Sequence, residues 1–319
     1  LGPNAGHSAT NASNSNFLGP NAGHSATSAS YSNFIGYNAG NGATSAYQSN
    51  FFGPYAGNGA TNASYSNFLG SFAGSGATSA SNSNFLGPNA GYGATDASYS
   101  NFLGTQAGNG ATNAYQSNFL GLNAGNGATG ASNSNFLGYY AGINATNASG
   151  SNFLGQSAGN GATNASNSTF IGKSAGNNDL VNNTGSPDDF SILIGPNTST
   201  GNNGSGVGYS NSIALGGYAT NTASNQFMIG STTRPINQIV MVASGGTTCA
   251  TDINGTACSS DERLKTNITD LTTGILDKVV NTKTVTFNWN NNTDTTSHIG
   301  FIAQDIQQYF PELVSTGST

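Results

Sequence analysis

A seventeen-residue repeat constrains this chain more than any other feature of its sequence. The unit is written without insertion or deletion from the first residue to about Gly176, and one copy, Ser32 to Gln48, reads SNFIGYNAGNGATSAYQ. Its phenylalanine returns at a constant interval of 17 residues. A period held this strictly indicates stacked, structurally equivalent units. The phenylalanines are Phe17, Phe34, Phe51, Phe68, Phe85, Phe102, Phe119, Phe136, Phe153 and Phe170.

Glycines at fixed places in every unit, such as Gly36 and Gly40, exclude a helical repeat. Each would cost about 1 kcal/mol in a helix interior. A short strand centred on the Phe-Leu pair, a glycine corner and a second short strand near Ala-Thr instead predict one coil of a parallel β-solenoid or β-roll. Coils would stack about 4.8 Å apart, so the Phe, Leu and Asn positions should form ladders along the axis. The expected fold class is all-β, with a small α+β segment at the C-terminal end.

The two large residues of each strand cannot share one core. Neighbours on a strand point to opposite faces, so Phe34 and Ile35 point apart, and a thin coil cannot hide both. An uncovered ladder would form a long apolar stripe, which soluble monomers avoid. We therefore predict that a partner chain covers one ladder, most simply in a homotrimer. The core and trimer positions singled out are Phe34, Ile35, Phe51, Phe52, Phe68, Leu69, Phe85, Leu86, Phe102 and Leu103.

Formal charge is almost absent from the repeats. Residues 1–176 contain only Asp96 and Lys173, so the net charge of −6 comes almost wholly from the remainder. Such a surface cannot steer nucleic acid or an anionic membrane. No apolar run approaches the ~20 residues of a membrane span. These features favour an extracellular location, on a cell surface or a virion. Because the sequence opens inside a repeat, we expect its true start and any secretion signal to be missing.

Three regions follow one another along the chain. Residues 1–178 are the regular repeats, and residues 179–248 keep the strand motif at irregular spacing, which indicates coils interrupted by loops. Residues 249–319 have the composition of an ordinary globular segment. Elements expected in this last region are a helix at 270–281 with Asp270 as its N-cap, strands at 285–289 and 299–302, and a short helix that reaches Tyr309 before Pro311.

Part of the repeat motif resembles a known bacterial family. The units at 151–155 (SNFLG) and 211–216 (NSIALG) resemble the YadA-like head repeats of trimeric autotransporter adhesins. That family folds as a parallel β-roll of three chains. The resemblance implies a homotrimer and a role in adhesion.

The C-terminal region resembles a second family. Its motifs are 260–268 (SDERLKTNI), 300–305 (GFIAQD) and 310–314 (FPELV). They resemble the endosialidase-type intramolecular chaperone domain of phage tail fibres and tailspikes, a self-cleaving peptidase family. The resemblance implies that Ser260 attacks the Ser259–Ser260 bond while Lys265 accepts its proton. Without it, a solvated turn is the favoured interpretation of Ser260 and Lys265. Cleavage would act once, in cis, so the protein would not be an enzyme that turns over substrate.

Cys249 and Cys258 are the only cysteines. An even count in a secreted-looking chain favours a disulfide over two free thiols. Two sulfurs are too few for a metal site, and the position shared by His7 and His24 carries other residues in later repeats, so neither a metal nor another cofactor is expected. Asn11, Asn62 and Asn164 open Asn-x-Ser/Thr sequons at one position of the repeat, so any glycans would line one face.

Three functions fit these observations. The leading interpretation is a structural and adhesive extracellular fibre, homotrimeric, with the array as a spacer and the C-terminal segment as an assembly aid. The alternative is a phage tail fibre whose array binds a host-surface receptor or glycan. A third function, binding to ice or to a polysaccharide crystal, is suggested by a threonine in every coil, as at Thr27 and Thr44. One threonine per coil, however, gives a line rather than the flat array that a crystal face needs. An enzyme acting on an external substrate is disfavoured, because residues 1–176 offer no acid/base pair.

Overall fold

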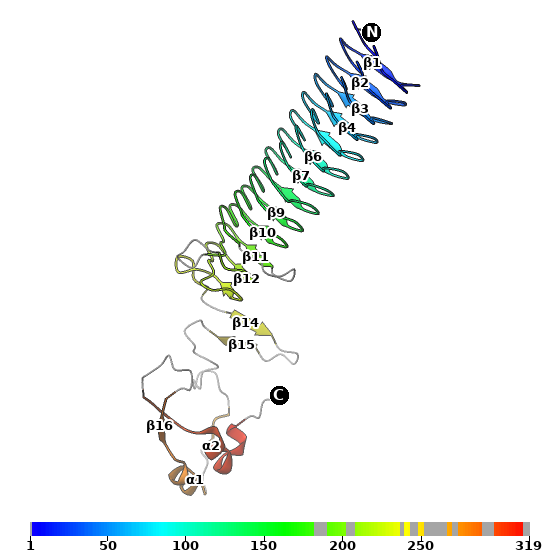
Figure 1. The fold of residues 1–319 in the computed structure, drawn as a ribbon. Coiled ribbons are helices and arrows are strands. Elements are labelled where there is room, and N and C mark those ends of the chain that lie inside the picture. Colours follow the sequence, from blue (N-terminus) through cyan, green and yellow to red (C-terminus); the bar gives the residue numbers. More distant parts are fainter. Residues whose placement is uncertain are drawn as a thin grey trace. The chain divides into compact units, whose positions relative to one another are not determined.

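The computed structural model describes residues 2–181, 190–201, 208–236, 239–242, 248–251, 267–269, 274–288 and 297–314. The chain forms two compact units, Leu1–Ile239 and Val240–Thr319 (Figure 1). The first unit is a parallel β-solenoid with a 17-residue repeat. The second contains short helices and a small antiparallel sheet. The predicted fold class, an all-β solenoid with a small α+β C-terminal segment, is confirmed.

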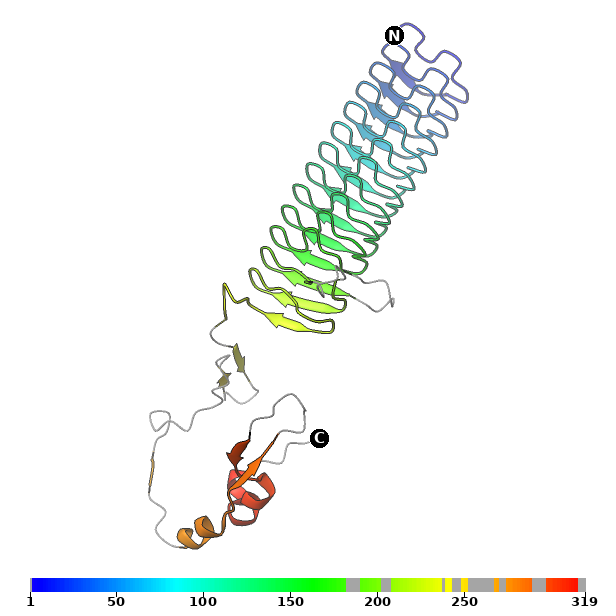
Figure 2. The ribbon, with the colours of Figure 1, turned by 60° about the vertical axis from the view of Figure 1, so that its left-hand side comes forward.

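Each coil contributes one short strand to a single parallel sheet that runs the length of the solenoid (Figure 2). Equivalent residues of successive repeats pair directly, as Phe17 does with Phe34. The sheet therefore has the strand order of the sequence. Its strands are β1 Asn16–Leu18, β2 Asn33–Ile35, β3 Asn50–Phe52, β4 Asn67–Leu69, β5 Asn84–Leu86, β6 Asn101–Leu103, β7 Asn118–Leu120, β8 Asn135–Leu137, β9 Asn152–Leu154, β10 Thr169–Ile171, β11 Ser191–Ile194, β12 Ser212–Leu215 and β13 Phe227–Ile229.

After each strand, residues with positive φ reverse the direction of the backbone, so that the repeat closes into one coil. Gly40 has φ 63°, and a Cβ there would lie 2.5 Å from the Phe34 ring. Gly36 has φ 138°, and its Cβ would lie 2.6 Å from the carbonyl of Gly53 in the next coil. Glycine is required at both places because a side chain would not fit the space, and because residues with a side chain rarely adopt these φ values.

The second strand expected near Ala-Thr is not formed. Thr95, Thr112, Thr129 and Thr146 pair with one another only as isolated parallel bridges. The residue after the threonine is left-handed in each of these coils, as at Asp96 with φ 48°. This reversal ends the extended conformation after one residue, so the prediction was wrong in length although the neighbouring coils do pair there.

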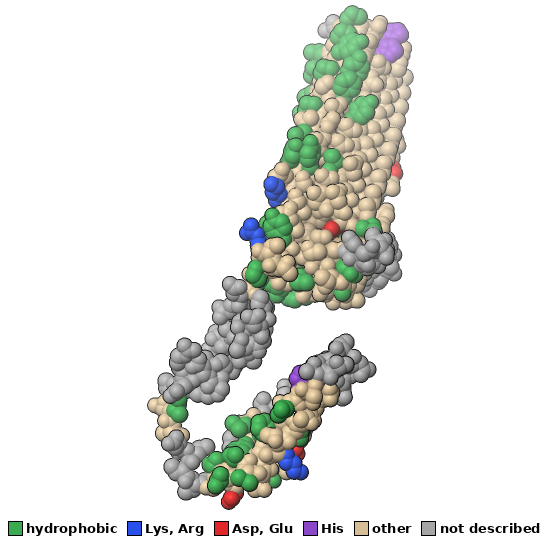
Figure 3. Space-filling model, turned by 90° about the vertical axis from the view of Figure 1, so that its left-hand side faces the viewer, with side chains coloured by type: hydrophobic (Ala, Val, Ile, Leu, Met, Phe, Trp, Pro, Cys, Tyr) green, Lys and Arg blue, Asp and Glu red, His purple; other side chains and the backbone are tan. Residues whose placement is uncertain are grey.

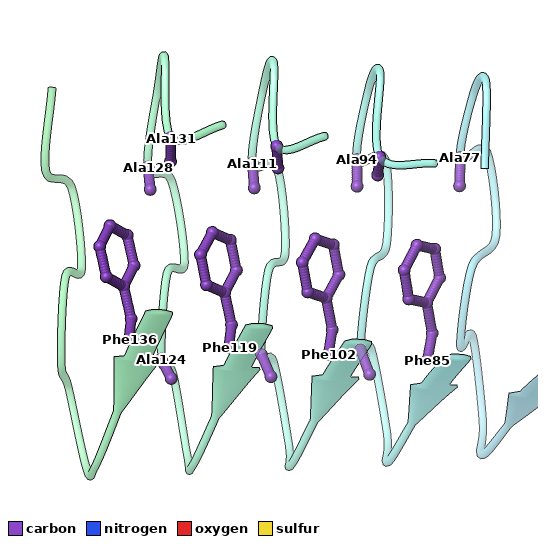
Figure 4. Packing of buried hydrophobic residues seen from close by; sticks show 14 of the residues in the cluster. Ala77, Phe85, Ala94, Phe102, Ala111, Phe119, Ala124, Ala128, Ala131 and Phe136 are labelled. Atoms are coloured by element: carbon purple, nitrogen blue, oxygen red, sulfur yellow. The ribbon is translucent and has the colours of Figure 1, made fainter. Parts of the chain in front are cut away.

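A stack of phenylalanine rings forms the solenoid core (Figure 4). From Phe34 to Phe170 successive ring centroids lie 4.7 or 4.8 Å apart. The alanines of the same coils close around them; Phe34, Ala39, Ala43 and Ala46 are all fully buried. Burying one such phenylalanine stabilises the fold by about 1.5–3 kcal/mol, and the parallel rings add offset-stacking contacts.

A buried serine ladder runs beside the core. The Oγ of Ser32 donates to the carbonyl of Ala46 at 2.5 Å and accepts from the backbone N–H of Ser49 at 3.1 Å. Ser49 and Ser66 repeat the same pair of bonds. Each buried hydroxyl therefore has both a donor and an acceptor partner, which removes the penalty of burying it. These serines were not predicted from the sequence.

Asp179 marks the end of the regular array. It stands 17 residues after Ala162, at a position that alanine fills in earlier coils. Its carboxylate accepts bonds from Ser199 Oγ and from the backbone N–H of Thr200, both at 2.7 Å. Burial raises the pKa of Asp179 above 3.8, although these hydrogen bonds oppose the shift. The carboxylate thus joins the last regular coil to the irregular coils that follow.

This raised pKa predicts a measurable pH dependence. The folded state holds a proton that the unfolded state loses, so stability falls as pH rises from 3.8 through the raised pKa, and the loss is complete above it. Asp179→Asn keeps the shape without the charge. We expect the melting temperature of Asp179→Asn to exceed that of wild type at pH 7 and to equal it at pH 3. Asp96→Asn, at an exposed site, is the control. Equal pH profiles for wild type and Asp179→Asn would contradict the assignment.

The described residues of the second unit form short strands and helices. They are β15 Thr248–Thr251, α1 Ile275–Asn281, β16 Val285–Phe287, β17 His298–Gly300, α2 Ala303–Tyr309 and the 3₁₀ turn η2 Pro311–Leu313, and β14 Ile239–Val242 begins at the last residue of the first unit. β16 and β17 pair antiparallel.

The elements expected in this unit are present, with shorter bounds. The helix expected from Asp270 begins at Ile275, and its N-cap is Gly274 with φ 74°, so the N-cap prediction was wrong. The end of this helix at Asn281 and the end of α2 at Tyr309 are as predicted. Among the described residues, no helix is long and apolar enough to cross a membrane.

Candidate assembly face

The residue after each phenylalanine points away from the core. Leu18, Ile35 and Phe52 are 45%, 40% and 37% exposed, and the equivalent leucines from Leu69 to Leu154 are half-buried. The two ladders predicted from the sequence therefore lie on opposite faces of the sheet. Phe34, Phe51, Phe68, Phe85 and Phe102 lie inside, whereas Ile35, Phe52, Leu69, Leu86 and Leu103 form the outer surface of the sheet.

An asparagine ladder borders this outer ladder. The side-chain amide of Asn33 donates to Asn50 Oδ1 at 2.8 Å, and Asn50 donates to Asn67 at 2.9 Å. The same bond joins successive coils from Asn16 to Asn152. Since each amide is held by its neighbours, the ladder is fixed before any partner binds. The Asn ladder expected from the sequence is confirmed.

Together the two ladders line a shallow groove of about 1080 Å³. We call this surface the assembly face. Figure 3 shows a side of the array where uncharged groups predominate and hydrophobic side chains gather along one edge. The lining residues are Asn50, Phe52, Asn67, Leu69, Asn84, Leu86, Asn101, Leu103, Asn118, Leu120, Asn135, Leu137, Asn152 and Leu154. No charged side chain lines the groove, so an apolar surface can cover it without burying a charge.

The second unit also exposes large apolar side chains. Leu276 and Val280 of α1 are 75% and 73% exposed, and Ile299 of β17 is 81% exposed. Neither α1 nor α2 contains a buried residue. Surfaces of this kind usually mark contact with another chain.

Metal-ligating groups do not gather in the described part of the chain. No three of its His, Cys, Asp and Glu side chains form a cluster that could hold an ion. The His7 and His24 rings stack at 5.4 Å, and each ring Nδ1 hydrogen-bonds to the following serine.

Residues 260–315 match a family model described as chaperone of endosialidase. This match covers the segment in which the second resemblance was found, and it confirms that part of the sequence analysis. It spans a small part of the chain. No curated protein matches the chain. The resemblance of the repeats to adhesin heads stays a prediction.

Several predicted sites lie outside the described residues. These are Ser259, Ser260, Lys265 and Cys258, together with the side chain of Cys249 in β15. The self-cleaving pair and the disulfide therefore stay predictions. Asn11, Asn62 and Asn164 occupy equivalent left-handed positions with φ 48°, 49° and 51°. Asn11 and Asn62 are exposed and Asn164 is half-buried; their glycosylation also stays a prediction.

A set of exposed aromatic side chains was not predicted from the sequence. They occupy variable positions of the repeat, where most coils carry small polar residues. A signal was available, because tyrosine or phenylalanine replaces asparagine at the same position in neighbouring coils, as at Tyr55 and Phe72.

Proposed function

We propose that this chain is part of a homotrimeric extracellular fibre of the phage tail-fibre type. In it the solenoid is a stiff shaft, and the C-terminal segment directs assembly and is then released. The fibre's virion or cell-surface location and a role in attachment belong to the same proposal.

The observation that carries the proposal is the assembly face. An uncharged apolar groove follows the sheet from β3 to β9, and a ladder repeated at every coil is complementary to copies of itself related by rotation about the fibre axis. Closed cyclic symmetry covers all copies of such a face at once. Three chains would bury the outer ladder around a common axis. The exposed apolar residues of the second unit support assembly at that end as well.

The match to the chaperone of endosialidase model supports a role for residues 260–315 in assembly. Identical repeats make a slip of one whole coil inexpensive, because every neighbour is replaced by its equivalent. A C-terminal domain that associates first would set the register of the three chains. Its removal afterwards would leave a kinetically stable fibre, since unfolded shafts could not find the register again.

The molar mass of the assembled chain tests the proposal directly. Light scattering with size exclusion should give three chains per particle at all concentrations at which the solenoid is folded. A folded monomer, or a particle with a different number of chains, would refute the trimer.

Self-cleavage has its own test. Ser260→Ala and Lys265→Ala should each yield a full-length folded trimer, because the nucleophile or its base is missing. Wild-type chains should end at Ser259 in intact-mass spectrometry. Thr266→Ala, close by in sequence but outside the proposed pair, is the control and should be cleaved. Mature wild-type chains that retain residues 260–319 would rule cleavage out.

A further inference from the structure

Four aromatic side chains form a continuous row on the surface of successive coils. They are Tyr37, Tyr55, Phe72 and Tyr92, which we call the aromatic row. Ring centroids lie 5.3 Å apart for Tyr37 and Tyr55, 4.6 Å for Tyr55 and Phe72, and 6.2 Å for Phe72 and Tyr92. Tyr37, Phe72 and Tyr92 are 46%, 37% and 45% exposed. The row therefore offers ring surface to solvent over four adjacent coils.

A tight turn in each coil brings these side chains together. The backbone N–H of Asn58 donates to the carbonyl of Tyr55, and that of Ser75 donates to the carbonyl of Phe72, both at 3.2 Å. The turn places the first and fourth of its residues near each other. As a result Tyr92, which closes one turn, reaches the ring of Phe72, which opens the turn of the preceding coil.

Two of the rings stand on unfavourable backbone. Tyr55 and Phe72 have φ 59° and 58°, in the left-handed region that bulky residues avoid. Most other coils place Asn, Ser or Gln at this position, and asparagine tolerates the conformation best. The stacked Tyr55–Phe72 pair recovers only part of the cost of two strained residues. Stability of the coil alone therefore does not account for the aromatic residues at this position.

The row is separate from the assembly face. The groove is lined only by the first and third residues of each strand, whereas the row lies beyond the glycine corner represented by Gly36. None of the four residues of the row lines the groove, so an interface at the groove does not require them.

We propose that the aromatic row binds a neutral polysaccharide. Three features favour this ligand. Sugar rings present apolar C–H faces that stack on aromatic rings, and hydroxyl edges that bond to tyrosine oxygens and to amides such as Asn38 and Asn58. The row contains no formal charge, so it has no counterpart for an acidic glycan or a charged peptide. Finally, its rings lie on four successive coils, so together they can contact several units of one polymer chain. This inference deepens the proposed attachment role and needs only an exposed solenoid.

Binding to displayed glycans tests the inference. The full chain is applied to protein-carried oligomers of glucose, mannose and N-acetylglucosamine, with heparin and polysialic acid as acidic comparisons. Wild type should bind at least one neutral oligomer, with affinity rising with oligomer length. Tyr55→Asn with Phe72→Asn restores the residue that other coils use. We expect this variant to keep the wild-type melting temperature or exceed it, and to bind at least tenfold more weakly.

A matched control separates the row from aromatic content in general. Tyr65 is also exposed and left-handed, with φ 60°, but it belongs to a second row with Tyr31 and Tyr47. Tyr65→Asn should bind like wild type. The inference is overturned if no neutral oligomer binds, if only acidic glycans bind, if the bare carrier protein binds equally, or if the double variant binds like wild type. The trimer is judged separately by particle mass, so failure of one proposal does not decide the other.

Discussion

Phe102→Ala should lower the free energy of unfolding by about 3–5 kcal/mol, the range found for truncating a buried phenylalanine. Phe102 is fully buried, and its ring lies 4.7 Å from Phe85 and 4.8 Å from Phe119. The change leaves a cavity and interrupts the stack, and the surrounding alanines are too small to fill the space. Because each coil contacts only its neighbours, the defect should also uncouple the coils on either side.

The measurement is thermal or denaturant unfolding followed by circular dichroism. We expect one transition for wild type and two for Phe102→Ala, as the coils before the defect unfold apart from those after it. Tyr115→Ala removes an aromatic ring that is 42% exposed in the same repeat and serves as the control. A shift no larger than that of the control would show that the phenylalanine stack does not carry the core.

Leu86→Asp combined with Leu103→Asp should abolish the trimer while each solenoid keeps its fold. Both side chains point outward from the sheet and line the groove. Inside a three-chain interface each substitution would bring three carboxylates together, and a buried unpaired charge costs far more than a leucine contact contributes. In the monomer only the two carboxylates of one chain repel each other, at a solvent-facing surface, which costs far less than burying six of them.

Particle mass and circular dichroism, measured together, separate these outcomes. Loss of trimer mass with an unchanged β spectrum is the expected result. Leu122→Asp introduces the same charge at a residue that is 42% exposed and absent from the groove lining, and should leave the trimer intact. If the double variant keeps trimer mass, the chains meet through another surface.

The sequence was informative about the repeat and less so about the detail within it. Period, parallel pairing and the Phe, Leu and Asn ladders follow from residues that recur at fixed places. The choice between Phe34 and Ile35 as the inward residue was not made from apolarity, because both are large and apolar. In the structure Phe34 is the inward residue, because Gly40 has no side chain and so leaves room for the Phe34 ring. The constant glycine six residues after each phenylalanine was therefore the available clue.

Other features were hidden by backbone conformation. The left-handed residue after each threonine shortens the expected second strand, and serine, asparagine and aspartate at that position gave only a weak turn signal. The aromatic row was missed because Tyr55 and Phe72 occupy a position treated as variable. Asp179 was missed because one residue outside the regular repeats carries no periodic signal. Predictions about Ser260 and Lys265 came from family resemblance, which the spacing of the two residues alone could not supply.

The asparagine ladder is continuous from Asn16 to Asn152, so whole repeats of the solenoid are interchangeable along it. Removing or adding one whole repeat rejoins each Asn to an equivalent Asn, each Phe to a Phe and each Gly to a Gly, so the ladders between coils are restored. Only contacts at variable positions, such as that of Tyr55 with Phe72, change. A deletion of any other length would shift the residues out of phase and break all ladders together. Recombination between such similar repeats can therefore change the shaft in steps of one coil, about 4.8 Å. The solenoid can thus differ in length while the ladders that join its coils are kept.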